Sequence, residues 1–153
     1  MPNLRIEPAT LEDLPELAAL LHDLFTLEPD FAPDPVKQSR GLRLILEQPA
    51  RGRIFVLRND RLIVGMINLL ITLSTAEGGF VLLLEDLVIH RDHRGLGYGS
   101  RLLRHAVEFA REKKFLRLTL LTHGNEDVRR FYLKHGFRES EMKPMRLIVS
   151  DEG

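Results

Sequence analysis

A long apolar run, three alternate glycines and an amphipathic stretch follow one another in the middle of this sequence, and together they constrain its fold most. The run extends from Phe80 to Ile89, is rich in aliphatic side chains and ends in a polar loop, which is typical of a buried strand. Behind the glycines, apolar residues recur with the spacing of one helix face, at Leu102, Leu103, Ala106, Val107 and Ala110. The sequence therefore predicts a strand, a glycine-rich loop and a helix in succession.

The loop has the composition of a site for a phosphate group. Gly95, Gly97 and Gly99 let the backbone turn freely, and their lack of a Cβ lets a ligand approach the backbone N–H groups. The first N–H groups of a helix have no intrahelical partners and carry the positive end of its dipole. We therefore expect a pyrophosphate to bind here. The alternative is a flexible connection whose glycines only permit a tight turn.

Two common phosphate-binding loops do not fit. A Walker loop requires a lysine before its serine or threonine, whereas Gly99 precedes Ser100. A dinucleotide-binding loop has the glycine order G-x-G-x-x-G and an acidic residue at the end of the next strand. Here the glycines run G-x-G-x-G, and the next apolar stretch ends in Leu121, Thr122 and His123.

The loop resembles the coenzyme A loop of the GNAT superfamily of N-acetyltransferases. That family has the pattern Arg/Gln-x-x-Gly-x-Gly/Ala after a strand, and residues 94–99, Arg-Gly-Leu-Gly-Tyr-Gly, fit it without a mismatch. A second element further along is also similar to the family: Asn125, the pair Phe131 and Tyr132, and then Gly136 and Phe137. The resemblance covers about residues 79–137 strongly and the N-terminal half in outline only.

The resemblance implies an acetyl-CoA site at the end of the apolar run and in the loop. Asn125 would hold a pantetheine or ligand amide, or it would cap the helix that begins at Glu126. Backbone groups that would bind the pantetheine amides are those of Leu87, Val88 and Ile89. Loop residues that would bind the cosubstrate are Arg94, Gly95, Leu96, Gly97, Tyr98, Gly99 and Ser100.

Two side chains are candidates for the chemistry of amine acetylation. An alkylamine has a pKa of about 10, so at neutral pH roughly one molecule in a thousand is nucleophilic, and a carboxylate could take its proton. By strand alternation Glu85 shares a face with Leu87 and Ile89, and we expect it to be the base. The alternative is a carboxylate that pairs with a nearby arginine or caps a loop. The resemblance implies that the Tyr132 hydroxyl donates a hydrogen bond to the thioester sulfur, unless its ring only packs the last helix.

The order of the expected elements matches the GNAT fold. It implies an α/β (α+β) domain over residues 1–153, with a central mixed, mostly antiparallel sheet of six to seven strands and four flanking helices. In that fold the fourth and fifth strands start paired in parallel and then splay apart. The last strands are expected at Phe137 and at Met145–Val149, and Thr10 with Asp13 is expected to form a capping box at the first helix.

Composition excludes several other functions. Lys plus Arg equals Asp plus Glu, 22 each, so no overall charge favours nucleic acid. Cysteine is absent, which excludes disulfides and a cysteine nucleophile, and His90 and His93 have no third ligand nearby, so no metal site is predicted. No apolar stretch reaches membrane length, and the N-terminus lacks a signal-peptide core. We expect a cytoplasmic protein without a membrane partner, which folds as one chain and can pair as a homodimer.

Sequence and resemblance together predict direct transfer of the acetyl group of acetyl-CoA to a primary amine of a small molecule. The alternatives are a protein or peptide N-acetyltransferase and a non-catalytic acyl-CoA-binding regulator. A further hypothesis concerns the stretch from Thr26 to Pro35, whose acidic residues would attract a cationic amine. Its acidic and aromatic residues, with the one just before it, are Phe25, Glu28, Asp30, Phe31 and Asp34. The alternative is an acidic loop that is simply solvated.

Overall fold

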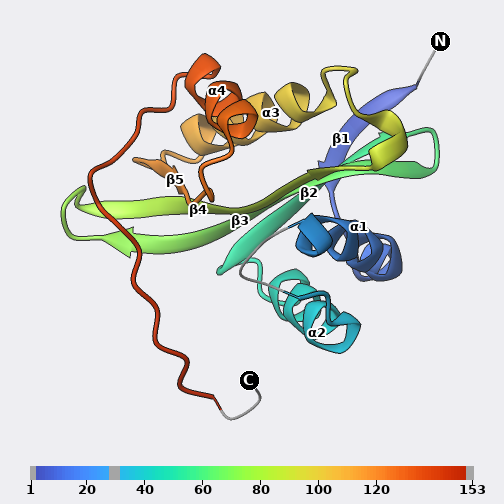
Figure 1. Cartoon of the computed structure of the whole chain (residues 1–153), viewed down its shortest axis with the longest axis horizontal. Helices are drawn as coiled ribbons and strands as arrows, with labels where there is room; N and C mark the ends of the chain where they lie inside the picture. Colours follow the sequence, from blue (N-terminus) through green and yellow to red (C-terminus); the bar gives the residue numbers. More distant parts are fainter. Residues whose placement is uncertain (1–2, 28–31, 151–153) are drawn as a thin grey trace. The chain divides into compact units, whose positions relative to one another are not determined.

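The computed structural model describes residues 3–27 and 32–150. The chain divides into two compact units, Met1–His123 and Gly124–Gly153 (Figure 1). In chain order the first unit contains β1 (Leu4–Pro8), the 3-10 helix η1 (Leu11–Asp13), α1 (Leu14–Leu27), α2 (Pro35–Leu46), β2 (Gly52–Asn59), β3 (Leu62–Ser74), β4 (Gly79–Ile89), the 3-10 helix η2 (Arg91–His93), α3 (Tyr98–Glu112) and β5 (Leu118–Leu120).

The strands of the first unit form one mixed sheet in the order β1-β2-β3-β4-β5. The first four strands are antiparallel, and β5 runs parallel to β4. β5 pairs only with Leu82, Leu83 and Leu84 of β4, whereas β4 itself continues to Ile89. Within the described residues, the edge of β4 from Glu85 to Ile89 therefore has no strand beside it on that side, as expected where two strands splay apart. We refer to these five residues as the open edge of β4.

The prediction of six to seven strands is wrong, because the described residues form five. Phe137 and Met145–Val149, where the last strands were expected, lie outside any strand. A strand exists only where a neighbouring backbone pairs with it, and an apolar pattern gives no information about that neighbour. Likewise, the alternation from Leu116 to Leu120 yields only three residues of paired strand.

Helices cover both faces of this sheet, α1 and α2 on one face and α3 on the other (Figure 1). On the first face, helix and strand residues share one apolar core, which contains Leu17, Leu20, Leu21, Leu42, Ile54, Val56, Ile63, Met66 and Val88. On the second face, Gly65 makes room for α3, because a Cβ there would lie 3.0 Å from Leu102 Cδ1. Phe55 meets the rings of His105 and Phe109 of α3 on this face, with centroids 4.6 and 5.1 Å away.

A capping box between Thr10 and Asp13 holds the start of η1, as the sequence predicts. The Thr10 backbone N–H donates to Asp13 Oδ2 at 2.9 Å, which confirms the predicted capping box in a short 3-10 turn that precedes α1. The same carboxylate accepts a hydrogen bond from Arg58 Nη2 at 2.8 Å. Arg58 also pairs with Glu7, so its guanidinium joins β1, β2 and the entry to α1.

The second unit contains one helix, α4 (Glu126–Lys134), and an extended segment behind it. Gly136, just past the end of α4, has φ +93°, in the left-handed region that favours glycine. Large apolar side chains of the extended segment are exposed, namely Met142, Met145, Leu147, Ile148 and Val149.

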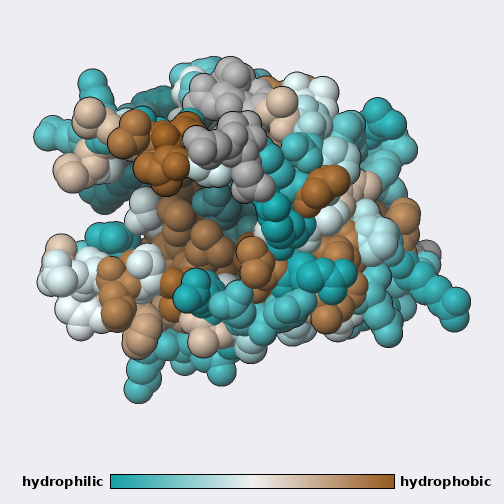
Figure 2. All heavy atoms as spheres, turned by 90° about the horizontal axis from the view of Figure 1, so that it is seen from below, coloured by the Kyte–Doolittle hydropathy of each residue, from teal (hydrophilic) through white to brown (hydrophobic). Residues whose placement is uncertain are grey.

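Figure 2 views the molecule from the side of α1 and α2 and shows that hydrophobic side chains also gather on the surface of that face. No described helix combines the length and apolar character needed to cross a bilayer.

Candidate active site

The glycine loop brings open backbone N–H groups to the start of α3. Gly97 is the N-cap residue at φ +81°, and Gly95 lies at φ +77°, both in the left-handed region that favours glycine. No side chain caps this end of α3, and a Cβ on either glycine would meet nothing within 4 Å. Among the described residues, the start of α3 thus has the positive end of the dipole, no side-chain cap and open space beside its glycines, which fits a phosphate group.

The remaining loop residues have different environments. Arg94 and Leu96 are exposed, whereas the Tyr98 side chain is only 8% exposed and packs inside, so Tyr98 can offer a ligand chiefly its backbone. The Arg94 side chain donates from Nε to the Ile89 carbonyl oxygen at 3.1 Å. It thereby connects the end of β4 to the loop while its guanidinium stays accessible to an anion.

The open edge of β4 directs some of its backbone groups away from the sheet. The His90 N–H donates to the Val64 carbonyl of β3 at 2.8 Å. In an antiparallel pair, alternate residues direct both backbone groups to the same neighbour, so Val88 shares the side of His90 while Leu87 and Ile89 face the open side. Of the three residues expected to bind pantetheine, Leu87 and Ile89 present backbone groups to a ligand, and Arg94 already contacts the Ile89 carbonyl.

Glu85 occupies a β-bulge. Asn68 lies opposite Asp86 and Leu69 opposite Leu84, so Glu85 is the extra residue between them. The expectation that Glu85 shares a face with Leu87 and Ile89 assumed uninterrupted alternation, which the bulge breaks at this residue. Its side chain is exposed, and the pairing with β5 ends at the residue before it. The bulge thus places a carboxylate where the open edge begins.

A buried polar pair beside the bulge was missed by reasoning from sequence. Asn68 is 3% exposed and Asp86 is 7% exposed, and Asn68 Nδ2 donates to Asp86 Oδ2 at 2.9 Å. Asn68 Oδ1 is buried and accepts no hydrogen bond from any described residue. An amide in the middle of the apolar stretch of β3 was the available signal, since a buried polar group needs a partner. The pair holds the Asp86 carboxylate inside the sheet, one residue from Glu85.

Asn125 and Tyr132 belong to the second unit, whereas the loop and the open edge belong to the first. Asn125 caps α4, because its Oδ1 accepts from the N–H groups of Asp127 and Val128 at 2.9 and 3.2 Å. Capping uses only the oxygen, so the amide nitrogen remains able to donate to a ligand. The Tyr132 ring meets Phe131 and Phe137 edge-on, with centroids 5.1 and 5.4 Å away.

Burial raises the pKa of the Tyr132 hydroxyl to about 12, because removal of water disfavours the phenolate. At neutral pH this hydroxyl is therefore protonated and is a hydrogen-bond donor. It donates to no described residue, so the proton is available to a group that approaches it. This supports the donor role expected for Tyr132 and makes a role as a base implausible.

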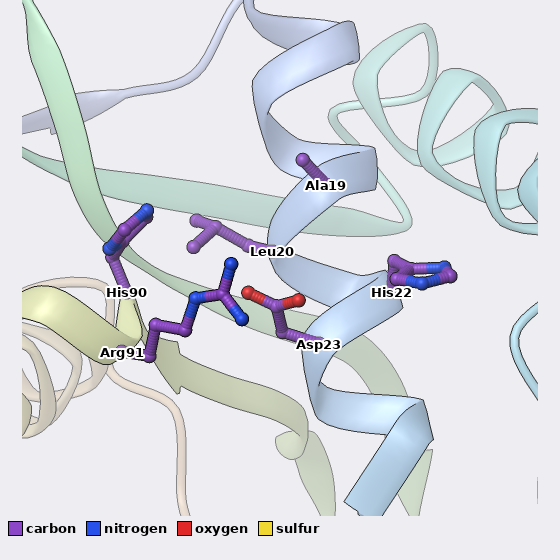
Figure 3. Close-up of a pocket in the computed structure, with 6 residues that line it drawn as sticks. All are labelled: Ala19, Leu20, His22, Asp23, His90 and Arg91. Carbon is purple, nitrogen blue, oxygen red and sulfur yellow. The ribbon is translucent and has the colours of Figure 1, made fainter.

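The first unit also contains a cavity between α1 and the end of β4, with a volume of about 320 Å³ (Figure 3). Its lining residues are Ala19, Leu20, His22, Asp23, His90 and Arg91. Sequence reasoning did not find this cavity and placed the acceptor wall in the stretch from Thr26 to Pro35. Glu28, Asp30 and Phe31 of that stretch lie outside the described residues, and the Asp34 carboxylate caps α2 by accepting from the Lys37 N–H at 3.2 Å.

The described residues contain no group of three or more His, Asp or Glu side chains that could hold a metal ion. His90 is instead engaged within its loop, where its Nδ1 accepts a hydrogen bond from the Asp92 N–H at 3.1 Å. We read the 3.8 Å approach of Nδ1 to the Asp92 carboxylate as proximity rather than an ion pair.

Comparisons with known proteins agree with this geometry. The model of the acetyltransferase (GNAT) family matches residues 16–137. The aminoalkylphosphonate N-acetyltransferase of Salmonella typhimurium (strain LT2) is 30% identical over 144 residues, which are 94% of this chain and 90% of that protein. Streptothricin acetyltransferase A of Bacillus subtilis (strain 168) is 41% identical over 56 residues, 36% of this chain and 32% of that protein.

A solved structure described as a probable acetyltransferase has 30% sequence identity and a TM-score of 0.83, and the match covers 96% of this chain and 99% of that one. The relative and the solved structure therefore match nearly the whole chain, and the family model matches residues 16–137. The protein is an acetyl-transfer enzyme, and the chain belongs to the acetyltransferase (GNAT) family.

Proposed function

We propose that the protein transfers the acetyl group of acetyl-CoA directly to a primary amine of a small molecule. The observation that carries this proposal is the uncapped start of α3 beside the open edge of β4. The loop offers N–H groups for a pyrophosphate, and the edge offers a row of backbone groups for an amide-bearing arm. Pantetheine amides attached to a pyrophosphate combine these two features in one molecule.

Three groups of residues would hold the cosubstrate. Leu87, Val88 and Ile89 would border the pantetheine arm, with the free backbone groups of Leu87 and Ile89 as its partners. The loop from Arg94 to Ser100 would bind the pyrophosphate through N–H groups and the Arg94 charge. Asn125 would contribute its free amide nitrogen while its oxygen continues to cap α4.

In the proposed reaction the amine nitrogen bonds to the thioester carbonyl carbon, the C–S bond breaks, and the thiolate leaves. Tyr132 would stabilise the developing thiolate by a hydrogen bond. Full transfer of its proton is strongly uphill, since a phenol of pKa about 12 against a thiol near 8.5 costs about 5 kcal/mol. The thiolate would take its final proton from solvent. Glu85 would take a proton from the bound ammonium, directly or through water, which leaves the neutral amine to attack.

Direct transfer is favoured because the chain has no cysteine to form an acyl-enzyme. A small acceptor is favoured by two observations. The cavity of about 320 Å³ lies at the lower end of the size range of ligand pockets. In addition, the relative from Salmonella typhimurium is named for an aminoalkylphosphonate, which is a small amine. A peptide acceptor and a non-catalytic regulator remain the alternatives that an experiment must separate.

The test combines binding and turnover on the purified protein. Isothermal titration calorimetry should show acetyl-CoA binding, and a thiol-release assay should show turnover with small primary amines above that with N-terminal and lysine peptides. Tyr132→Phe should lower kcat by roughly 100-fold, the effect of one lost transition-state hydrogen bond, with little change in acetyl-CoA affinity. Binding without thiol release for any amine would identify a regulator. A consistent preference for peptides would refute the small acceptor.

A further inference from the structure

We propose that the cavity between α1 and the end of β4 binds a small zwitterionic acceptor, with Arg91 holding its acidic group and Asp23 its ammonium. This inference rests on the proposed function and names the class of amine that the enzyme takes. It departs from the cationic acceptor expected from the acidic stretch between α1 and α2.

The first argument is the arrangement of charge in the cavity. Asp23 comes from α1 and Arg91 from the turn after β4, and Figure 3 shows that both side chains point into the space between these elements. Neither side chain forms a hydrogen bond or an ion pair with any described residue, although one carries each sign of charge. Two opposite charges in one cavity that do not neutralise each other can each bind the complementary charge of one ligand.

The second argument is that both charged residues sit on well-anchored backbone. Leu20, in the cavity wall, is 3% exposed and belongs to the core beneath α1. At the other wall the His90 N–H is bonded to Val64 of β3, and the His90 ring accepts from the Asp92 N–H. The backbone beside Asp23 and Arg91 is therefore held in place at both walls, so a ligand has only the two side chains to order.

The third argument concerns size and net charge. Among the lining residues of the cavity, Asp23 carries a formal negative charge and Arg91 a formal positive charge. Their charges cancel, so a ligand of no net charge matches the cavity. A diamine would bring a second ammonium towards Arg91, and that like-charge contact disfavours it. The volume suits an amine and an acidic group joined by a short chain.

The experiment compares acceptors that share a two-carbon chain and differ in the group opposite the amine. Thiol release is measured at saturating acetyl-CoA with 2-aminoethylphosphonate, β-alanine, taurine, ethanolamine and 1,2-diaminoethane. The proposal expects kcat/KM to be at least 10-fold higher for one of the three acidic acceptors than for ethanolamine, and lowest for the diamine. The three acids identify which anion Arg91 prefers. Equal rates for ethanolamine and the acidic acceptors, or a preference for the diamine, would overturn it.

Variants test the two residues. Arg91→Gln should raise KM for the preferred acidic acceptor about 10- to 100-fold, the range for one lost charge-assisted hydrogen bond, and leave KM for ethanolamine within 2-fold. Asp23→Asn should raise KM for every amine. Arg61→Gln and Asp60→Asn, in the exposed β2–β3 turn, make the same chemical changes outside the cavity and serve as controls. A rise in KM for acetyl-CoA in Arg91→Gln, with acceptor KM unchanged, would assign the cavity to the cosubstrate.

Calorimetry separates this inference from the proposed function. The preferred acidic amine should bind the wild-type protein in the presence of coenzyme A and bind Arg91→Gln at least 10-fold more weakly, whether or not turnover occurs. Binding of this kind without thiol release would leave the cavity assignment standing and remove the proposed activity. Turnover of other amines without any binding of an acidic amine would leave the proposed activity standing and overturn the cavity assignment.

Discussion

At the scale of single residues, burial decides what Tyr132 can contribute. Its ring packs edge-on against those of Phe131 and Phe137, and burial raises the pKa of its hydroxyl to about 12. A phenol in water is half ionised near pH 10, so this side chain remains a donor over two further pH units. The residue is therefore suited to stabilise a negative sulfur and poorly suited to take a proton from the amine.

This shift can be measured directly because the chain has two tyrosines. In Tyr98→Phe, Tyr132 is the only tyrosine, and its phenolate absorbance should rise with a midpoint near pH 12. A midpoint near 10 in a protein that is still folded by circular dichroism would contradict the burial. In the unfolded chain Tyr132 ionises first, so its contribution to stability is fully present below pH 10 and is lost between about pH 10 and 12. The loss amounts to about 3 kcal/mol.

At the scale of elements, the start of α3 combines a conformational requirement with a binding role. Gly97 at φ +81° ends the loop and begins the helix, and no side chain occupies the space in front of its N–H groups. Glycine is needed twice here, once for the left-handed backbone and once for the approach of a ligand. These two requirements can be separated, because Gly78 in the β3–β4 turn has almost the same backbone, at φ +79°, and equally open surroundings.

Gly97→Ala and Gly78→Ala form a matched pair. Both should lose about 1–2 kcal/mol of folding free energy, because each forces a side chain into the left-handed region. Only Gly97→Ala should weaken acetyl-CoA binding, by roughly 10-fold or more, since its Cβ would stand between the helix N–H groups and the pyrophosphate. Calorimetry and thermal unfolding measure both effects. Equal acetyl-CoA affinity in the two variants would remove the loop from the site.

At the scale of the whole molecule, the parts that sequence predicted are those with local causes. The strand, loop and helix from Phe80 to Glu112 follow from apolar periodicity and glycine spacing within about thirty residues of chain. The mixed sheet and its parallel last pair followed from the family resemblance. Asn125 as a helix cap was predicted as an alternative, and it is confirmed, because capping depends on the next three residues alone.

The features that sequence did not predict have non-local causes. The bulge at Glu85 depends on the register with β3, and alternation along one strand contains no such information. The pair of Asn68 and Asp86 joins two strands 18 positions apart in the chain. The cavity contains both Asp23 and Arg91 because α1 packs against β4, which the sequence does not reveal. The prediction of strands at Phe137 and Met145–Val149 was wrong for a related reason, because a strand forms only where a neighbouring strand edge pairs with it.

The open edge of β4 also has a consequence for the colloidal behaviour of the protein. A strand edge with free N–H and C=O groups is a template for a second chain, and its pairing leads to aggregation. Along Glu85–Ile89 the bulge and the carboxylates protect the beginning of the edge, whereas the aliphatic residues Leu87, Val88 and Ile89 follow without proline or lysine. Unliganded protein at high concentration should therefore self-associate along this edge.

Fragments of the cosubstrate distinguish this edge from the glycine loop. Pantetheine, which would occupy the edge, should reduce light scattering of a concentrated solution, whereas adenosine 3′,5′-bisphosphate should not. An equal decrease in light scattering with both fragments would show that self-association does not occur along the open edge of β4. If pantetheine alone protects, the cosubstrate acts as the missing neighbour of β4, and the solubility of the enzyme in a cell depends on its supply of coenzyme A.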